Sequence, residues 1–238
     1  MAKANYGLYG SRGFFLLFIL IALVSLTFAV FFSYLRVVFI FISVLAVVLL
    51  FAVPAIFVRN REGGVPQILS AGKISTGCFV LDVGTGRGFP AIEIAKAVPG
   101  CRVIGIDVWD QPAEGQVHKG FLVGNTKENA ERNAMIEGVQ DRVEFRQLDA
   151  RKMPFGSETF DAVVSFSAIH QMVYFGPGGE RVLGEIYRVL KRGGRFVDVD
   201  VLTGTRMVEL IRDIGFTEIA LENYRLLGIL KILSATKV

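Results

Sequence analysis

A glycine-rich turn directly after an apolar strand constrains the fold of this chain more than any other feature. Residues 80–88 read Val-Leu-Asp-Val-Gly-Thr-Gly-Arg-Gly. Gly84, Gly86 and Gly88 let the backbone take positive φ angles and approach a ligand closely. In an open parallel sheet, such a turn lies at the carboxyl end of a strand, where ligands bind. The spacing is G-x-G-x-G, with Phe89 where a dinucleotide-binding loop has a third Gly or Ala.

Strand and helix patterns alternate through the rest of the chain. Strands are expected at 78–83, 102–107, 142–146, 160–165 and 195–200, and helices at 89–97, 126–137, 180–190 and 205–214. Two further strands are expected at 216–222 and 226–236. This order predicts an α/β domain over residues 78–238, with a mostly parallel sheet covered by helices on both faces.

Two acids accompany the turn. Asp82 lies two residues before Gly84, and a buried carboxylate there is costly unless a ligand ammonium group or a bound water partners it. Asp107 ends the apolar strand Val103–Asp107. An acid at that strand tip is placed to accept hydrogen bonds from ribose hydroxyls. A capping or turn aspartate is the alternative, and the glycine turn upstream favours ribose binding.

These motifs resemble the class I S-adenosylmethionine-dependent methyltransferases. The resemblance covers residues 75–238 and includes Leu148-Asp149-Ala150, Phe160–Ser165 and Arg188–Phe196 in the family's order. It implies a Rossmann-like doubly wound sheet of seven strands, with an antiparallel pair at the end. It also implies S-adenosyl-L-methionine as the cofactor and a methyltransferase activity, and it does not identify the methyl acceptor.

The resemblance assigns residues to the cofactor one by one. Gly84, Gly86 and Gly88 would line its methionine and sugar portions beside Asp82, and Asp107 would bind the ribose. Asp149 and Ala150 would approach the adenine amino group, and Ser165 belongs to the fourth motif of the same site. Trp109 either packs on the adenine ring or simply fills space.

His170 is the candidate catalytic base. It follows the fourth expected strand, where the family's acceptor approaches the methyl group, and an imidazole of ordinary pKa accepts a proton near neutral pH. A structural or helix-capping role is equally compatible with its position. Tyr174 is a weaker candidate on the same segment. Asp198 and Asp200 alternate with valines; one of them is expected to face the cleft, and neither is assigned a catalytic role.

Other polar residues have simpler interpretations. Asn125 and Glu128 fit a helix cap followed by an acid at the third helical position. The loop 110–124, which contains His118, either covers the cofactor or is a variable surface loop. Cys78 and Cys101 match no metal-binding spacing, and we expect buried thiols in a reducing compartment. No metal site is predicted.

The first 58 residues are almost wholly apolar. Two charge-free runs flank Arg36, and each approaches the roughly 20 residues that a membrane span needs. We therefore expect a membrane anchor over 1–58, with two transmembrane helices at about 14–33 and 37–58 and a turn at 33–36. A cleaved signal peptide is the competing interpretation. Residues 59–77 form a linker with one short helix around Pro66–Ala71.

The basic residues around this anchor predict an integral protein of the cell membrane with a cytoplasmic globular domain. Small residues recur at Ser25, Ala29 and Ser33, a spacing that brings helices close together either within the hairpin or in a homodimer. The expected partners are thus the lipid bilayer and a hydrophobic small-molecule acceptor. The net charge of +4 is spread along the chain without a basic block, so no nucleic-acid partner is expected.

The sequence therefore favours a membrane-anchored methyltransferase acting on a lipid-soluble small molecule. A soluble acceptor is one alternative, and a non-catalytic sensor or scaffold that binds the cofactor is another. A nicotinamide-dependent oxidoreductase is disfavoured by the G-x-G-x-G spacing and by the third and fourth motifs.

Overall fold

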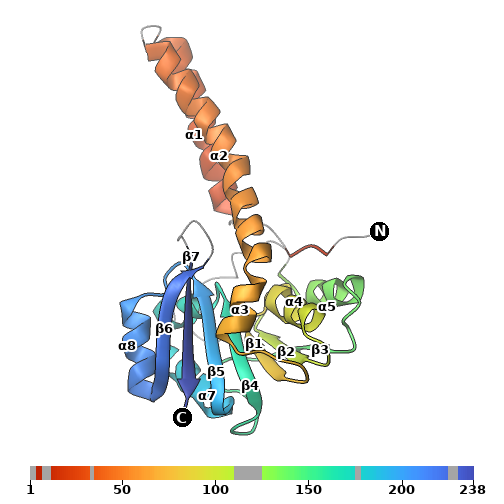
Figure 1. Ribbon diagram of the computed structural model, residues 1–238. Coiled ribbons are helices and arrows are strands. Elements are labelled where there is room, and N and C mark those ends of the chain that lie inside the picture. Colours follow the sequence, from red (N-terminus) through yellow and green to blue (C-terminus); the bar gives the residue numbers. More distant parts are fainter. Residues whose placement is uncertain (1–3, 7–11, 33–34, 110–124, 175–177, 225–229) are drawn as a thin grey trace. The chain divides into compact units, whose positions relative to one another are not determined.

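The computed structural model describes residues 4–6, 12–32, 35–109, 125–174, 178–224 and 230–238 (Figure 1). Residues 4–6 and the chain from Gly63 onward belong to one compact unit, and the long N-terminal helices form the other. The loop 110–124, with His118, lies outside the described residues, so its predicted role is not addressed.

The larger unit contains one seven-stranded sheet in the order β3-β2-β1-β4-β5-β7-β6. Its strands are β1 (Phe79–Val83), β2 (Arg102–Asp107), β3 (Val143–Gln147), β4 (Phe160–Phe166), β5 (Leu190–Asp200), β6 (Phe216–Tyr224) and β7 (Leu230–Lys237). The first five are parallel, and β7 is antiparallel to both β5 and β6. The chain order reverses between β1 and β4, which places the switch point at the glycine turn. This confirms the predicted Rossmann-like α/β sheet.

Helices cover both faces of this sheet (Figure 1). They are α3 (Val65–Ala71), α4 (Phe89–Ala97), α5 (Lys127–Ile136), α6 (Ile169–Tyr174), α7 (Gly179–Val189) and α8 (Thr205–Ile214). The main core lies between the sheet and the helices α7 and α8. Its fully buried members include Leu81, Val163 and Phe196 on the sheet and Ile186 and Ile211 on the helices. The short helix expected near Pro66 is α3.

One helix start differs from the prediction. Thr126, not Asn125, caps α5, because its side chain accepts a hydrogen bond from the Asn129 N–H at 3.3 Å. Asn and Thr are both good N-cap residues, so adjacent copies leave the cap position undecided in sequence. Asn125 Oδ1 is instead buried without a partner among the described residues.

The two cysteines are buried, as predicted, and they lie together. Cys78 precedes β1 and Cys101 precedes β2, and the pairing of these strands brings their Sγ atoms to 2.6 Å. Burial, followed by the neighbouring thiol, raises the pKa of Cys101. A thiol held in its protonated form is a poor nucleophile and metal ligand, so Cys101 serves packing.

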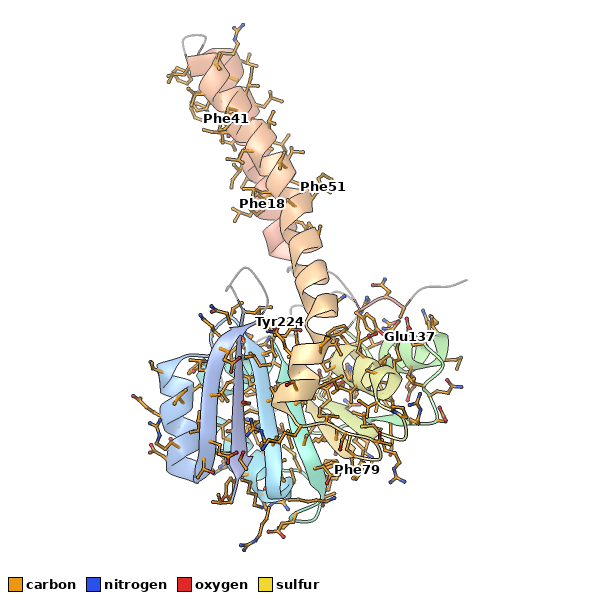
Figure 2. All side chains as sticks on the ribbon, in the orientation of Figure 1. Phe18, Phe41, Phe51, Phe79, Glu137 and Tyr224 are labelled. Atoms are coloured by element: carbon orange, nitrogen blue, oxygen red, sulfur yellow. The ribbon has the colours of Figure 1, made fainter. Side chains whose placement is uncertain are left out.

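The apolar N-terminal runs form two helices, α1 (Arg12–Phe31) and α2 (Arg36–Gly63). Ser25 and Ala29 are buried within this single chain, and Ser43 Oγ on α2 donates to Ala22 O on α1 at 3.1 Å. Two of the three small residues of the stripe, Ser25 and Ala29, are thus buried in the hairpin. Large apolar side chains such as Phe41 and Phe51 remain exposed (Figure 2). A homodimer through these helices stays a prediction.

The prediction of a transmembrane hairpin is wrong. Among the residues that the structure describes, no helix combines the length and the apolar content required to cross a bilayer. The prediction that this is an integral protein of the cell membrane is overturned with it. The sequence argument relied on the absence of charge over two runs, and freedom from charge is not the same as a sufficiently long and apolar helix.

Arg195 ties the end of α3 to the sheet. Its guanidinium donates to Ala71 O at 2.9 Å, to Ser234 Oγ at 2.9 Å and to Thr236 Oγ1 at 2.6 Å. The residue is only 8% exposed. Removing this buried donor leaves three acceptors without their partner.

We expect Arg195→Ala to lower the free energy of unfolding by roughly 3 kcal/mol, because hydrogen bonds from a buried charge are lost. Arg192→Ala is the matched control. Its side chain is 80% exposed and forms an ion pair with Glu158, so its loss should cost less than about 1 kcal/mol. Urea unfolding of both variants checks this, and equal costs would show that Arg195 does not anchor α3.

Candidate functional site

The glycine turn adopts the positive φ angles that its sequence predicts. Gly84, Gly86 and Gly88 have φ angles of 74°, 57° and 85°, a region that favours glycine. A Cβ added at Gly84 would lie 2.2 Å from the Cβ of Ala168. The segment after β4 therefore packs directly on the turn, and His170 is two residues further along. This contact brings the candidate base and the turn to one edge of the sheet.

Asp107 fastens the end of β2 to the same turn. Its Oδ2 accepts the Gly86 N–H at 2.8 Å, and its Oδ1 accepts the N–H groups of Val108 and Trp109 at 2.7 and 3.2 Å. Burial raises its pKa, and these backbone bonds oppose that rise. A carboxylate oxygen accepts two hydrogen bonds, so Oδ2 retains capacity for a ligand hydroxyl.

Trp109 also contacts the glycine turn. Its indole Nε1 donates to Gly86 O at 2.8 Å, and its backbone φ is 41°. The side chain is 6% exposed. Trp109 is thus fixed on the glycine turn, next to the predicted ribose site, and its stacking on a base stays a prediction.

Asp82 lies fully buried beneath the turn. Its Oδ2 accepts from Thr85 Oγ1 at 2.6 Å and from the Ala91 N–H at 3.2 Å. Its Oδ1 has no partner among the residues described. Burial raises the pKa of Asp82 to about 7. A buried oxygen without a partner is costly, and a cationic or hydrogen-bond-donating ligand at the turn would satisfy it.

A segment from the chain's beginning also contacts the turn, which no sequence signal indicated. The buried Asn133 side chain on α5 donates to Arg87 O at 3.0 Å and to Asn5 O at 3.1 Å. It also accepts the Asn5 N–H at 2.9 Å. Tyr6 packs edge-on against Phe89, with ring centroids 5.4 Å apart. Residues 5 and 6 are therefore part of the site's support.

The predicted adenine-contacting residues lie next to Asp107. Leu148 N donates to Asp107 O at 3.0 Å, which places the start of this segment beside β2. The Asp149 carboxylate is bonded by the Arg151 guanidinium at 2.8 Å. Burial favours its neutral form, but the Arg151 bonds prevail and lower its pKa. Ala150 packs in the core. The adenine contact stays a prediction.

A second polar cluster surrounds His170 on the α6 side of the sheet. His170 Nδ1 lies 2.5 Å from Asp200 Oδ2, and Asp200 is fully buried. Asp198 is also fully buried and accepts from Thr203 Oγ1 at 2.5 Å. Its Oδ1 and the Oγ of Ser165 have no partner among the described residues. Ser165 and Asp198 are paired neighbours on β4 and β5.

The electrostatics of this cluster are unusual for aspartates. Burial, followed by the charge of Asp200, raises the pKa of Asp198 to about 8. Burial and the nearby Asp198 also raise the pKa of Tyr174. Both aspartates project from the same face, because they lie two positions apart on one strand. The sequence predicted that one of them faces the cleft, and no sequence signal indicated the contact with His170.

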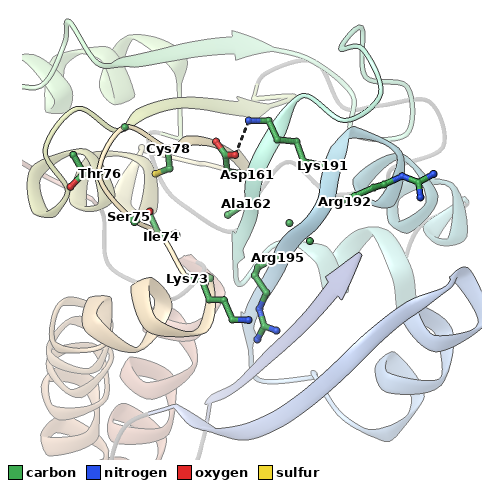
Figure 3. A pocket seen from close by; sticks show the side chains of 14 residues that line it. Lys73, Ile74, Ser75, Thr76, Cys78, Asp161, Ala162, Lys191, Arg192 and Arg195 are labelled. Carbon is green, nitrogen blue, oxygen red and sulfur yellow. Dashed lines mark hydrogen bonds and ion pairs between the residues drawn. The ribbon is translucent and has the colours of Figure 1, made fainter. Parts of the chain in front are cut away.

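A different cavity of about 380 Å³ lies at the amino ends of the central strands (Figure 3). Residues before β1, at the start of β4 and in the first half of β5 line it. Its basic side chains are paired: Lys191 with Asp161 at 2.7 Å, for example. Parallel sheets bind ligands at the carboxyl ends of their strands, so this cavity is separate from the glycine turn.

Comparison with known proteins agrees with the geometry of the turn. Residues 81–198 match a protein family described as a methyltransferase domain. Sterol 24-C-methyltransferase of Eremothecium gossypii is 40% identical over 123 residues, which are 52% of this chain and 28% of that protein. Erythromycin 3''-O-methyltransferase of Saccharopolyspora erythraea is 34% identical over 137 residues, 57% of this chain and 39% of that protein. The chain thus spans less than half the length of these curated relatives.

A solved structure shows the same fold. Geranyl diphosphate C-methyltransferase from Streptomyces coelicolor, in complex with S-adenosyl-L-homocysteine, superposes with a TM-score of 0.57 over 74% of this chain and 76% of that chain. The two sequences are 14% identical, so this likeness concerns the fold alone. The family identifies S-adenosylmethionine as the cofactor of the domain. The glycine cradle and the unsatisfied Asp82 Oδ1 fit a cofactor of this kind.

The raised pKa of Asp198 makes stability depend on pH. Between about pH 4 and 8 the folded protein holds a proton that the unfolded chain has released, so the free energy of unfolding falls as pH rises, by roughly 1 kcal/mol per pH unit. Asp198→Asn cannot ionise and should lose this part of the dependence. Its advantage over the wild type should therefore grow toward pH 8.

Urea unfolding at pH 5, 6.5 and 8 measures this difference. Asp82 titrates in both proteins and cancels in the comparison. Asp213→Asn, at an exposed position of α8, is the matched control and should parallel the wild type. Parallel curves for Asp198→Asn would mean that Asp198 is ionised in the folded protein at neutral pH.

Proposed function

We propose that the whole chain is a class I S-adenosylmethionine-dependent methyltransferase that transfers the cofactor's methyl group to a hydrophobic small molecule. The match of residues 81–198 to a methyltransferase domain family supports this proposal. The observation that carries this proposal is the glycine turn locked to Asp107 beside the buried Asp82. The names of the relatives support the acceptor class, since they refer to sterols and to erythromycin.

Each residue of the turn has a role in the proposed complex. Gly84, Gly86 and Gly88 admit the cofactor against the backbone, and Asp82 Oδ1 accepts a hydrogen bond from it or from a water beside it. Asp107 Oδ2 accepts a further hydrogen bond, from a ribose hydroxyl. Trp109 covers the base, with Asp149 and Ala150 beside the adenine amino group.

In methyl transfer the main task of the protein is to position the acceptor. Bound S-adenosylmethionine supplies an electrophilic methyl group, and transfer is an in-line displacement by the acceptor. The chain must hold the acceptor opposite that methyl group, exclude water, and remove a proton where the acceptor carries one. His170 is the proposed base, because the Ala168 contact brings its segment onto the cofactor turn.

Two alternative functions are a methyltransferase with a water-soluble acceptor and a protein that binds the cofactor without catalysis. A water-soluble acceptor would leave the cofactor site unchanged and alter only the acceptor pocket. A sensor or scaffold would bind the cofactor without transferring its methyl group. The contact between His170 and the buried Asp200 favours an enzyme, because a nucleophile-activating base is typically oriented by a third group in this way.

The test incubates the full chain with S-adenosylmethionine carrying a labelled methyl group. Sterols, prenyl alcohols and quinols are compared with water-soluble phenols and amino acids. We expect label only in the hydrophobic products. Gly84→Ala should reduce transfer at least about a hundredfold, because its Cβ collides with Ala168 and displaces the turn.

Gly138→Ala is the matched control. Gly138 also has a positive φ, 69°, but a Cβ there meets nothing within 4 Å, so transfer should persist. Label confined to water-soluble products would contradict the acceptor class. Cofactor binding without transfer to any acceptor would favour the scaffold.

A further inference from the structure

We propose that the cluster of Ser165, His170, Asp198 and Asp200 receives a hydroxyl group of the acceptor and deprotonates it, so that the chain methylates oxygen. This inference rests on the proposed methyl transfer and names the acceptor chemistry of the same site. It goes beyond the relatives, whose names include both C- and O-methyltransferases.

The fold places this cluster on the acceptor side of the cofactor turn. Ser165 and Asp198 are partners across β4 and β5, at the carboxyl ends of both strands. Asp200 follows on the same face and meets His170 at the start of α6. Ala168, between β4 and α6, contacts the position of Gly84 in the turn. The polar groups therefore sit beside the place where the methyl group is delivered.

The cluster contains more hydrogen-bonding capacity than the chain uses. Ser165 Oγ and Asp198 Oδ1 are buried, and neither has a partner in the described part of the protein. A hydroxyl group, alone or with one bound water, supplies both a donor and an acceptor for them. An alkene carbon brings neither. Sites built to bind a hydroxyl reject an analogue without it by roughly 10⁴- to 10⁵-fold.

Asp200 acts on His170 rather than on the acceptor, and so it is a positioning residue. Its Oδ2 lies 2.5 Å from Nδ1 of the imidazole. A neutral imidazole that donates from Nδ1 carries its lone pair on Nε2, and this is the nitrogen that accepts a proton. Asp200 also offsets the positive charge that appears when His170 accepts that proton. The same division of labour occurs wherever a carboxylate orients a catalytic histidine.

The surrounding charges suit this role. Among the described residues, the titratable groups near the pair include Asp198 on β5, Tyr174 on α6 and Arg206 on α8. The Arg206 guanidinium lies 5.5 Å from the Tyr174 ring centroid. Burial, then the charge of Asp200, raises the pKa of Asp198 to about 8. A neutral Asp198 can donate a hydrogen bond to the acceptor oxygen, and Asp200 faces His170.

The step balances without any further reagent. The acceptor O–H gives its proton to His170 Nε2, and the oxygen forms a bond to the methyl carbon. The methyl–sulfur bond breaks at the same time, and its electron pair stays on sulfur. The products are a methyl ether and the neutral thioether of the cofactor. His170 then releases the proton to solvent.

The first experiment gives the full chain and S-adenosylmethionine an acceptor with both nucleophiles: a sterol with a 3-hydroxyl and a side-chain double bond. Farnesol and its methyl ether, and cholesterol and its methyl ether, form matched pairs. We expect methyl ethers as products, from the free alcohols only. A C-methylated product, or equal turnover of an alcohol and its ether, would overturn the proposal.

A variant tests the positioning role. Asp200→Asn should lower kcat by roughly 10²- to 10⁴-fold, the contribution of a general base, and leave the KM for S-adenosylmethionine unchanged. The exposed Asp213→Asn should behave as wild type. Nitrogen-15 NMR of the histidines gives a readout that a packing role would not change. The chain has two histidines, and His170→Gln assigns the signals.

The NMR measurement also decides the case in which no tested acceptor is turned over. In protein saturated with S-adenosylhomocysteine, farnesol and cholesterol should shift the His170 Nε2 signal, and their methyl ethers should not. The absence of any shift with alcohols, in protein that still binds the cofactor, would overturn the hydroxyl site alone. Loss of cofactor binding itself would instead contradict the proposed function.

Discussion

The hydrogen bond from the Gly86 N–H to the Asp107 carboxylate is the contact on which the site depends. It joins the turn after β1 to the tip of β2, and Trp109 returns a second bond to the carbonyl of Gly86. Together they fix a loop whose positive φ angles carry no stabilising energy of their own. Because Ala168 rests on this loop, the same contact also sets the position of the segment that carries His170.

Two buried aspartates lie on opposite faces of the sheet, one at the cofactor turn and one in the proposed acceptor cluster. Asp82 faces α4 beneath the cofactor turn, and Asp198 faces α6 and Thr203. Burial raises the pKa of each, to about 7 and about 8, and each has one oxygen without a partner among the described residues. Such groups cost stability, and that cost is typical of residues kept for binding or catalysis.

The sequence predicted the features that depend on neighbouring residues, such as helix ends and the glycine turn. Helices α4 and α8 begin and end as expected, because Gly88, Gly204 and Gly215 interrupt their patterns at the ends. The cofactor turn followed from its glycines. The His170–Asp200 pair spans 30 residues and the Asn5–Asn133 contact 128 residues, and only strand order and packing bring these partners together. Strand β5 starts at Leu190 rather than 195, since pairing with Phe160 recruits the residues before Gly193.

The account is tested most directly by calorimetric titration of S-adenosylmethionine into the full chain and into Asp107→Ala. The account predicts a single site with micromolar affinity in the wild type, and loss of that binding in a variant that stays folded by circular dichroism. Asp213→Ala should bind as the wild type does. Equal binding by the wild type and Asp107→Ala, or no binding to a folded wild-type protein, would contradict the assignment of the glycine turn as the cofactor site.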